Sequence, residues 1–474
     1  MAKPVKAAGK RVEAAKPAAP KTVRVWEDDP LSTGAVPVER PVPKLPKARM
    51  KLAFDMAQPS TGPHDVSTAE FRYWVAVDAL ARAVAFWQPL LPKNQTWQRG
   101  AQLDIRLDAG DKLNAFYNRQ TLTFFHGTSA GQTVYTAESP DVVSHECGHA
   151  ILDAIRPQLW DAMSHEVAAL HESFGDLSAM LVGLQLDSLR AAVLNETGGV
   201  LNRNSRISRI AEQLGWAIRQ QRACAVDADC LRNAVNCFVY QPPEQLPISG
   251  PAVTLSSAPH SYSRVFTGAF LVALTGMVVV LSREANRPPD SDMLRQASVD
   301  AGRLLVTAVQ AAPIVPAYLS QVAAHLVAAD QQLFNGKYAE AVDNGFFSKG
   351  LLTATSVTAA SRAAPSMALS GARGRARGGE LPTLAVAAEE FGLGDRPLLL
   401  VAPAEPPSLA VSAIARDGGP ATPSTAEATA RGFLRELMVR DRIALPGRPR
   451  GDRLDTHEVV EDGNALRVVR RLID

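Results

Sequence analysis

The stretch that decides the fold comprises residues 141–180 and has the sequence DVVSHECGHAILDAIRPQLWDAMSHEVAALHESFGDLSAM. Its first part contains the pattern H-E-x-x-H, formed by His145, Glu146 and His149. Ser139 is a favourable N-cap, so the pattern is predicted to lie on a helix. Because residues four apart lie one turn above each other on a helix, the two imidazoles can bind one metal ion.

Glu146 follows the first histidine and can reach water at the metal as a general base. The helix around the pattern is apolar, so both histidines are expected in or beside a buried face. Buried histidines need partners, and a metal ion supplies one. The pattern therefore predicts a hydrolytic zinc site, although the same spacing also arises by chance on solvated helices.

A catalytic zinc ion has three protein ligands and one open position. Glu172, on a second apolar helix, is the predicted third ligand, and Asp176, one turn further on, can accept the N–H of a ligating histidine. Asp153 is an alternative on the first helix, but three ligands from one helix fit a tetrahedral site poorly. The remaining candidates are expected on the solvated face of the second helix and stay open as ligands: His165, Glu166 and His171.

The order H-E-x-x-H and then E-x-x-x-D resembles the gluzincins, and thermolysin-like metallopeptidases in particular. Three further segments are similar to that family. Residues 141–146 (DVVSHE) resemble its lead-in to the zinc helix, and residues 114–117 (NAFY) resemble its substrate-binding strand. Residues 260–263 (HSYS) resemble the segment that carries its second catalytic histidine. The resemblance covers about residues 55–352.

The resemblance implies a metallopeptidase with Zn²⁺ as cofactor and a peptide or protein as substrate. His260 would stabilise the oxyanion, and Asn114 and Ala115 would bind the substrate backbone along an exposed edge strand. Without the resemblance, such a histidine would be a cap or a surface residue, and such an asparagine would belong to a turn. The family's oxyanion-stabilising tyrosine is missing, and Trp160 is the only aromatic residue between the zinc helix and Glu172.

Five regions are expected along the 474 residues, in an α+β fold. The metallopeptidase core consists of a small N-terminal sheet with the zinc-bearing helices and a second, α-helical subdomain. Within the first of these, residues 114–117 and 122–125 are predicted to pair across a turn. The regions are a disordered basic, Pro-rich arm (1–54), the α+β subdomain (55–180), the α-helical subdomain (181–352), a flexible linker (353–380) and a small α/β appendage without recognised chemistry (381–474).

The composition is that of a globular protein, with 46% hydrophobic and 21% charged residues. A formal net charge of +2 gives no reason to expect a nucleic-acid partner. The N-terminus lacks the apolar segment of a signal peptide, and the apolar run at residues 269–281 is too short to span a bilayer. We expect no membrane partner and a cytoplasmic location, with export that needs no signal peptide as the alternative.

Three cysteines lie close together in the sequence, at Cys224, Cys230 and Cys237. They allow one disulfide or three free thiols, and their spacing is not that of a zinc finger. They do not decide the compartment.

The predicted function is that of a zinc endopeptidase. A non-catalytic zinc-binding scaffold for protein–protein interaction is the alternative, but structural zinc does not need the base Glu146. A helical interaction module with an accidental motif is a second alternative. An aminopeptidase would need an acidic anchor for the substrate amine, and the sequence has no convincing G-x-M-x-N-type strand.

Overall fold

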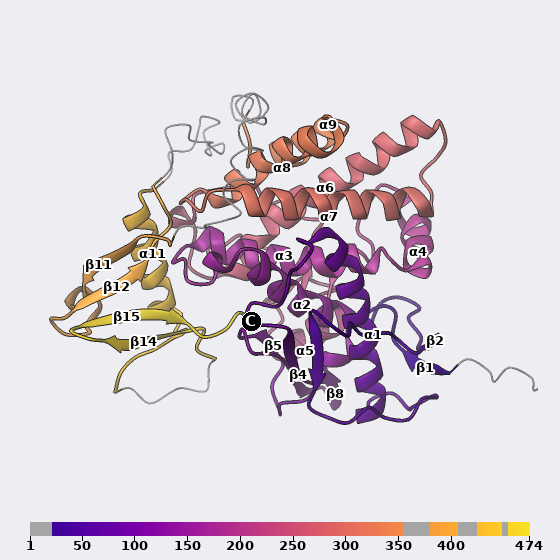
Figure 1. Ribbon diagram of the computed structural model, residues 1–474, viewed down its shortest axis with the longest axis horizontal. Coiled ribbons are helices and arrows are strands. Elements are labelled where there is room, and N and C mark those ends of the chain that lie inside the picture. The colour runs from indigo at the N-terminus through magenta and orange to yellow at the C-terminus, as the bar shows by residue number, and fades with distance from the viewer. Residues whose placement is uncertain (1–20, 354–379, 406–423, 448–453) are drawn as a thin grey trace, which may run out of the picture.

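The computed structural model describes residues 21–353, 380–405, 424–447 and 454–474. Within them, the mixture of helices and small sheets confirms the α+β class. Figure 1 shows a larger core beside a smaller C-terminal sheet that carries one long helix. Residues 1–20 and nearly all of the predicted linker lie outside the described residues.

The first described segment is folded, with β1 (Thr22–Val25) antiparallel to β2 (Val38–Pro41). Val25 is fully buried, and Trp26 packs edge-on against Phe71 with 6.3 Å between the ring centroids. The prediction of a disordered arm up to residue 54 is therefore wrong from residue 22 onward. Alternating apolar residues let this Pro-rich stretch bury one face, and that burial offsets the cost of ordering the chain.

The N-terminal sheet has the strand order β3–β4–β6–β5. Its strands are β3 (Lys51–Phe54), β4 (Gln102–Arg106), β5 (Ala115–Tyr117) and β6 (Thr121–Phe124). β3, β4 and β6 run parallel, whereas β5 is antiparallel to β6 with Ala115 opposite Phe124, which confirms the predicted hairpin. In its turn, Asn118 Oδ1 accepts the N–H of Thr121 at 2.7 Å. β5 is an edge strand of this sheet and lies beside α2 (Pro140–Ile155).

Three helices pack together behind this sheet: α1 (Ala69–Trp87), α2 (Pro140–Ile155) and α3 (His165–Gly183). Trp87 of α1 stacks on Phe174 of α3 at 5.0 Å between ring centroids, and its indole N–H donates to Ser178 at 3.0 Å. A second hairpin consists of β7 (His126–Ser129) and β8 (Gln132–Tyr135).

The second subdomain is helical, as predicted. Its helices are α4 (Asp187–Thr197), α5 (Glu212–Gln221), α6 (Pro259–Ala285), α7 (Ser291–Ala311), α8 (Tyr318–Phe334) and α9 (Ala339–Ser348). Two short strands pair beside α5, β9 (Arg209–Ile210) and β10 (Arg232–Asn233). Single-turn 3₁₀ helices occur at Gln88–Leu90, Thr136–Glu138, Pro157–Leu159, Pro243–Gln245 and Ala388–Phe391.

Helix α6 is the central helix of this subdomain and packs against α3, α7 and α9. Among the described helices it is by itself long and apolar enough to cross a membrane, but 67% of its most apolar window is buried inside the protein. That burial fits the predicted core helix. All four cysteines are free, so the possible disulfide among the three clustered cysteines does not form in this structure.

The C-terminal domain is a small α/β unit, as predicted, with the strand order β11–β12–β15–β14–β13. Its elements are β11 (Thr383–Ala387), β12 (Pro397–Val401), α11 (Ala426–Val439), β13 (Ile443–Ala444), β14 (His457–Asp462) and β15 (Ala465–Arg470). Met163 and Ala168 of the larger core belong to the same apolar cluster as the interior of this domain. The domain is therefore docked on the core beside α3.

Candidate active site

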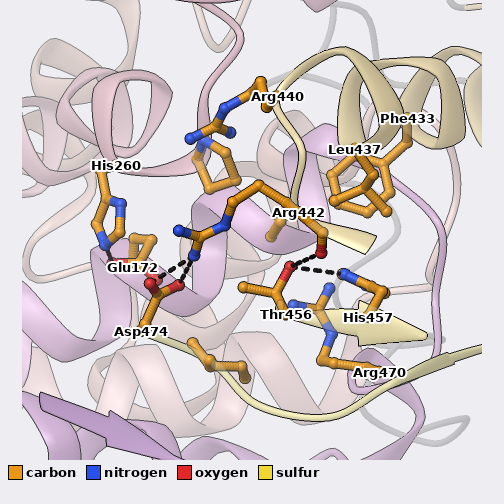
Figure 2. Close-up of a pocket in the computed structure, with 13 residues that line it drawn as sticks. Glu172, His260, Phe433, Leu437, Arg440, Arg442, Thr456, His457, Arg470 and Asp474 are labelled. Atoms are coloured by element: carbon orange, nitrogen blue, oxygen red, sulfur yellow. Dashed lines mark hydrogen bonds and ion pairs between the residues drawn. The ribbon is translucent and has the colours of Figure 1, made fainter. Parts of the chain in front are cut away.

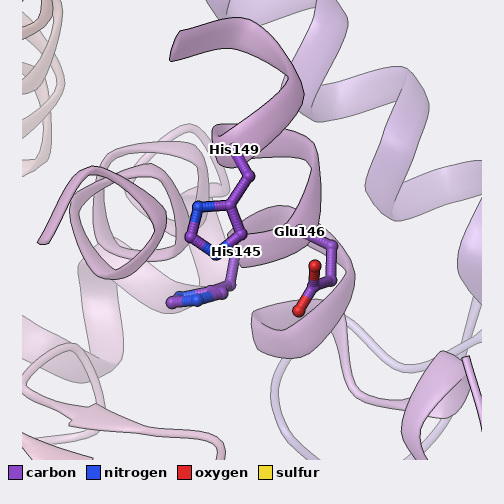
Figure 3. A group of neighbouring side chains, drawn as sticks. All are labelled: His145, Glu146 and His149. Carbon is purple, nitrogen blue, oxygen red and sulfur yellow. The ribbon is translucent and has the colours of Figure 1, made fainter. Parts of the chain in front are cut away.

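Helix α2 places the H-E-x-x-H side chains together. It begins at Pro140, and the Ser139 side chain caps it by accepting the N–H of Val142. His145 and His149 have ring centroids 4.6 Å apart, and candidate ligand atoms of His145, Glu146 and His149 all lie within 4.8 Å of one another. Figure 3 shows His145 and Glu146 on one turn of the helix and His149 on the next. All three side chains are buried.

Helix α3 brings Glu172 to the same place. One carboxylate oxygen lies 3.6 Å from His145 Nε2, and the other lies 3.9 Å from His149 Nε2. The arrangement agrees with Glu172 as the third ligand, a role that stays a prediction.

Two glycines allow this close approach of α2 and α3. A Cβ on Gly148 would lie 2.8 Å from the Ser178 side chain and 3.0 Å from the backbone of Gly175. A Cβ on Gly175 would lie 2.5 Å from the His145 ring. Any larger residue at either position would push the helices apart or displace His145.

The alternative ligand Asp153 points elsewhere. It accepts the hydroxyl of Tyr117 at 3.0 Å and pairs with Arg119 at 2.8 Å. The other three candidates were expected on a solvated face, and that expectation is wrong because the C-terminal domain and the helical subdomain cover α3. His165 pairs with Glu436 of the C-terminal domain at 2.9 Å. The other two are also buried: Glu166, which accepts hydrogen bonds from Tyr240 and Leu319, and His171, whose ring centroid lies 6.0 Å from that of His149.

Asp176 lies where its predicted supporting role requires it. One of its oxygens is 3.1 Å from His145 Nδ1, and the same oxygen pairs with the Arg232 guanidinium at 2.7 Å. Burial opposes charge on Asp176, but Arg232 and His145 outweigh it and lower its pKa to about 2. Arg232, on β10, is a site residue that sequence reasoning missed. A lone arginine in an irregular stretch carries no local signal of burial beside a histidine.

His260 lies at the first turn of α6, with Nε2 2.9 Å from a Glu172 oxygen. Its side chain is 40% exposed, unlike the buried histidines of α2. The structure therefore brings the second predicted catalytic histidine, more than 100 residues from α2 in the chain, to the Glu172 carboxylate. His260 also lines the cleft that contains Glu146.

The buried charges shift each other's pKa values. Burial, and after it the neighbouring His145, lower the pKa of His149 to about 3. Burial acts in the same direction on His145, but hydrogen bonds to Asp176 and Glu172 outweigh it and raise its pKa to about 9. Burial raises the pKa of Glu146 to about 8, with His145 opposing the shift. Neutral His149 has the protonation state that binds a metal ion.

Asn114 and Ala115 line a cleft together with the zinc-helix residues. This cleft contains about 390 Å³ of space, including open solvent. Its other lining side chains are Val142, His145, Glu146, Ile210, Ala211, Leu214, Leu231, Arg232, His260 and Asp474. The predicted substrate strand, the predicted general base Glu146 and His260 therefore line one space.

Trp160 does not point into this cleft. Its indole N–H donates to the carbonyl of Arg470 in the C-terminal domain at 3.3 Å, and its ring packs edge-on against Tyr117. In this arrangement Trp160 cannot replace the missing tyrosine as an oxyanion donor.

Comparison with known proteins agrees with the metallopeptidase site that this geometry indicates. Residues 58–153 match the family described as thermolysin metallopeptidase, catalytic domain. The match includes the H-E-x-x-H motif and ends before Glu172 and His260. The chain is a thermolysin-like zinc metallopeptidase by class.

The search of curated proteins gave no match. Among solved structures, the chain is similar to the precursor of protealysin, a metalloproteinase from Serratia proteamaculans. The two chains are 16% identical with a TM-score of 0.39, over 72% of this chain and 90% of the other. The class assignment rests on residues 58–153 and on the geometry of α2.

Proposed function

We propose that the protein is a zinc-dependent endopeptidase that cleaves peptide bonds within extended segments of proteins. The observation that carries this proposal is the buried group of His145, Glu146 and His149 beside the carboxylate of Glu172. Two imidazoles and one carboxylate form a known ligand set of hydrolytic zinc, and a neighbouring glutamate is the base that hydrolysis requires.

The buried polar atoms support a metal ion at this place. Both ring nitrogens of His149 and one oxygen of Glu146 are buried without a hydrogen-bond partner. Such atoms destabilise a fold unless a ligand satisfies them. We propose that His145, His149 and Glu172 hold the ion, while Asp176 fixes the ring of His145. When bound, zinc supplies a Lewis acid that polarises the scissile carbonyl and lowers the pKa of water.

The remaining chemistry belongs to two side chains at the cleft. Glu146 takes a proton from the attacking water and delivers it to the amine that leaves. His260 donates a hydrogen bond to the oxygen that gains negative charge as the carbonyl is attacked. With Trp160 turned away, His260 is the side chain to which we assign this stabilisation.

The substrate is proposed to bind along β5. A peptide that extends the sheet would form backbone hydrogen bonds with the edge of Asn114–Tyr117 that faces away from β6, beside α2. Asn114 and Ala115 line the same cleft as Glu146, so an extended peptide there would present a bond to the base. This placement favours cleavage within a chain.

The proposal is tested with denatured casein, the zinc-loaded protein and a Glu146→Gln variant. The wild type is expected to make internal cuts that mass spectrometry locates. The variant is expected to keep its zinc and to lose about 10²–10⁴-fold in rate, because only the proton carrier is removed. Glu340→Gln, an exposed change on α9, is the matched control and should cut like the wild type.

Zinc content, measured by atomic emission on the same samples, separates the possible failures. Equal cutting by wild type and Glu146→Gln would overturn the role of Glu146. The endopeptidase proposal itself would be overturned if the zinc-loaded protein cuts nothing and the variants that free the edge of β5 are inactive as well.

A further inference from the structure

The edge of β5 was expected to be exposed, and in this structure it is occupied. On one side β5 pairs with β6. On the other side Ile473 N donates to the carbonyl of Tyr117 at 2.8 Å, and Tyr117 N donates to the carbonyl of Ile473 at 2.9 Å. The two residues form an antiparallel bridge, so the segment after β15 adds to the sheet as a substrate would. Figure 1 shows the C-terminal end of the chain beside β5.

The same segment enters the catalytic cleft. Asp474 lines the cleft that contains Glu146, Arg232 and His260. It also lines a second space of about 420 Å³ between the core and the C-terminal domain, to which Glu172 and His260 contribute as well. Figure 2 shows Asp474 beside Glu172 and His260, with its carboxylate bound by Arg442. Asp474 therefore lies at the boundary between the two spaces.

The segment is held in place by the docked domain. Arg470 Nε donates to the carbonyl of Trp160 at 2.7 Å, and the Trp160 indole N–H donates back to the Arg470 carbonyl. The Ile473 side chain is 3% exposed and belongs to the core cluster of the metallopeptidase. Glu436 of α11 adds a further contact between the two domains, because it pairs with His165 of α3 at 2.9 Å.

We propose that residues 472–474 form a built-in competitor of the substrate and that the C-terminal domain is an autoinhibitory domain of this peptidase. A peptide on the edge of β5 needs the N–H and carbonyl of Tyr117, and both are already bound to Ile473. The two occupants exclude each other. Because the competitor is tethered, its effective concentration reaches the millimolar range even though its own contacts are few.

This inference rests on the proposed peptidase function and adds the way in which that function is restrained. Activity requires that the segment leave β5, while the metal-binding side chains of α2 and α3 stay in place. A substrate therefore competes with residues 472–474 in the intact chain, and this competition raises the apparent KM more than it lowers kcat.

The test replaces the residue that forms the bridge. Ile473→Pro removes the N–H that bonds Tyr117, whereas Ile473→Val keeps both backbone bonds and an apolar side chain. For a quenched fluorescent peptide, kcat/KM of the proline variant is expected to rise about tenfold over wild type, since one or two hydrogen bonds are lost from the closed state. The valine variant should stay near wild type.

Because Ile473 is buried, a second variant protects the test against misfolding. A chain that ends at Arg471 loses the bridge and leaves β15 complete. Its thermal unfolding checks the fold, and it should match or exceed the proline variant in kcat/KM. The synthetic peptide RVVRRLID, which has the sequence of residues 467–474, should inhibit it competitively, whereas a scrambled peptide should not.

The outcomes separate the two proposals. Active wild type with unchanged or lower kcat/KM in both folded variants overturns autoinhibition and leaves the peptidase standing; a decrease would mean that the segment completes the site. If zinc-loaded wild type and variants all fail to cut, the peptidase proposal fails. In that case the binding of a fluorescent peptide hydroxamate tests whether residues 472–474 compete with a substrate. About tenfold tighter binding by the variants supports the competition, and equal affinity overturns it.

Discussion

The two walls of the cleft are built in different ways. The core wall, helices α2 and α3, consists of neighbouring elements whose site residues are at most 31 positions apart, from His145 to Asp176. The C-terminal wall, the described part of residues 381–474, reaches the cleft from another domain. Its contact between Trp160 and Arg470 joins residues 310 positions apart. The core wall carries the proposed metal ligands and the proposed general base, and the C-terminal wall is proposed to control access to them.

Adjacent residues at the start of α3 show the division most directly. The side chain of His165 pairs with Glu436 of the C-terminal wall, whereas Glu166 accepts hydrogen bonds from Tyr240 and Leu319 inside the core. Because α3 is buried on all sides, neighbouring residues of this one helix contact the C-terminal wall and the interior of the core. The difference shows that catalytic residues can be encoded by local spacing while their accessibility is encoded by docking.

The largest expected effect concerns stability on the core side. Burial raises the pKa of Glu166 from 4.5 to about 8, so the carboxyl stays protonated in the folded state over a range in which it ionises in the unfolded state. The folded state therefore binds more protons between these values, and the free energy of unfolding should fall as pH rises from 5 to 8, by up to about 4 kcal/mol. Glu166→Gln, neutral at both pH values, should remove this part of the decrease.

Urea unfolding at pH 5 and pH 8, in the presence of a zinc chelator, measures this difference without contributions from metal release. Glu340→Gln serves again as the exposed control. A variant with the same pH dependence as wild type would show that Glu166 is ionised in the folded protein.

The next effect concerns zinc affinity. Asp176→Asn keeps the size of the side chain but removes the charge that holds His145 and Arg232, so the dissociation constant for zinc should rise about 10- to 100-fold. Competition with a chromogenic chelator measures it. Asp187→Asn, at an exposed position with 93% of its side chain accessible, should leave the affinity unchanged. An unchanged value for Asp176→Asn would remove Asp176 from the metal site.

The smallest effect concerns the C-terminal wall. Burial opposes the charge of Glu436, but the hydrogen bond from His165 outweighs it and the pKa of this carboxyl is lowered. Glu436→Gln weakens a charge-assisted hydrogen bond by about 1 kcal/mol, so peptidase activity should rise about fivefold as docking loosens. Glu427→Gln, on an exposed face of the same helix, is the matched control. Reduced activity in Glu436→Gln would contradict an inhibitory wall.

The hairpin at residues 114–125, the two site helices and the helical subdomain could be predicted because each depends on local signals. Alternation marks strands, helical spacing joins His145 to His149, and Ser139 caps α2. The N-terminal hairpin was missed because a Pro-rich, basic composition resembles disorder, whereas its order depends on packing against α1 and on contacts with other parts of the core. Arg232 was missed because burial beside Asp176 depends on β10, a two-residue strand without a pattern of its own.

By itself, the sequence determined the class of the protein and the side chains of the candidate metal site on α2, because a helix converts a fixed spacing into a fixed geometry. Only the tertiary structure decided that α3 is covered by a second domain, that Trp160 faces Arg470 and that Ile473 occupies the edge of β5. These contacts join surfaces separated by hundreds of residues. They depend on how whole faces of the two domains pack together, and no local sequence pattern predicts this packing.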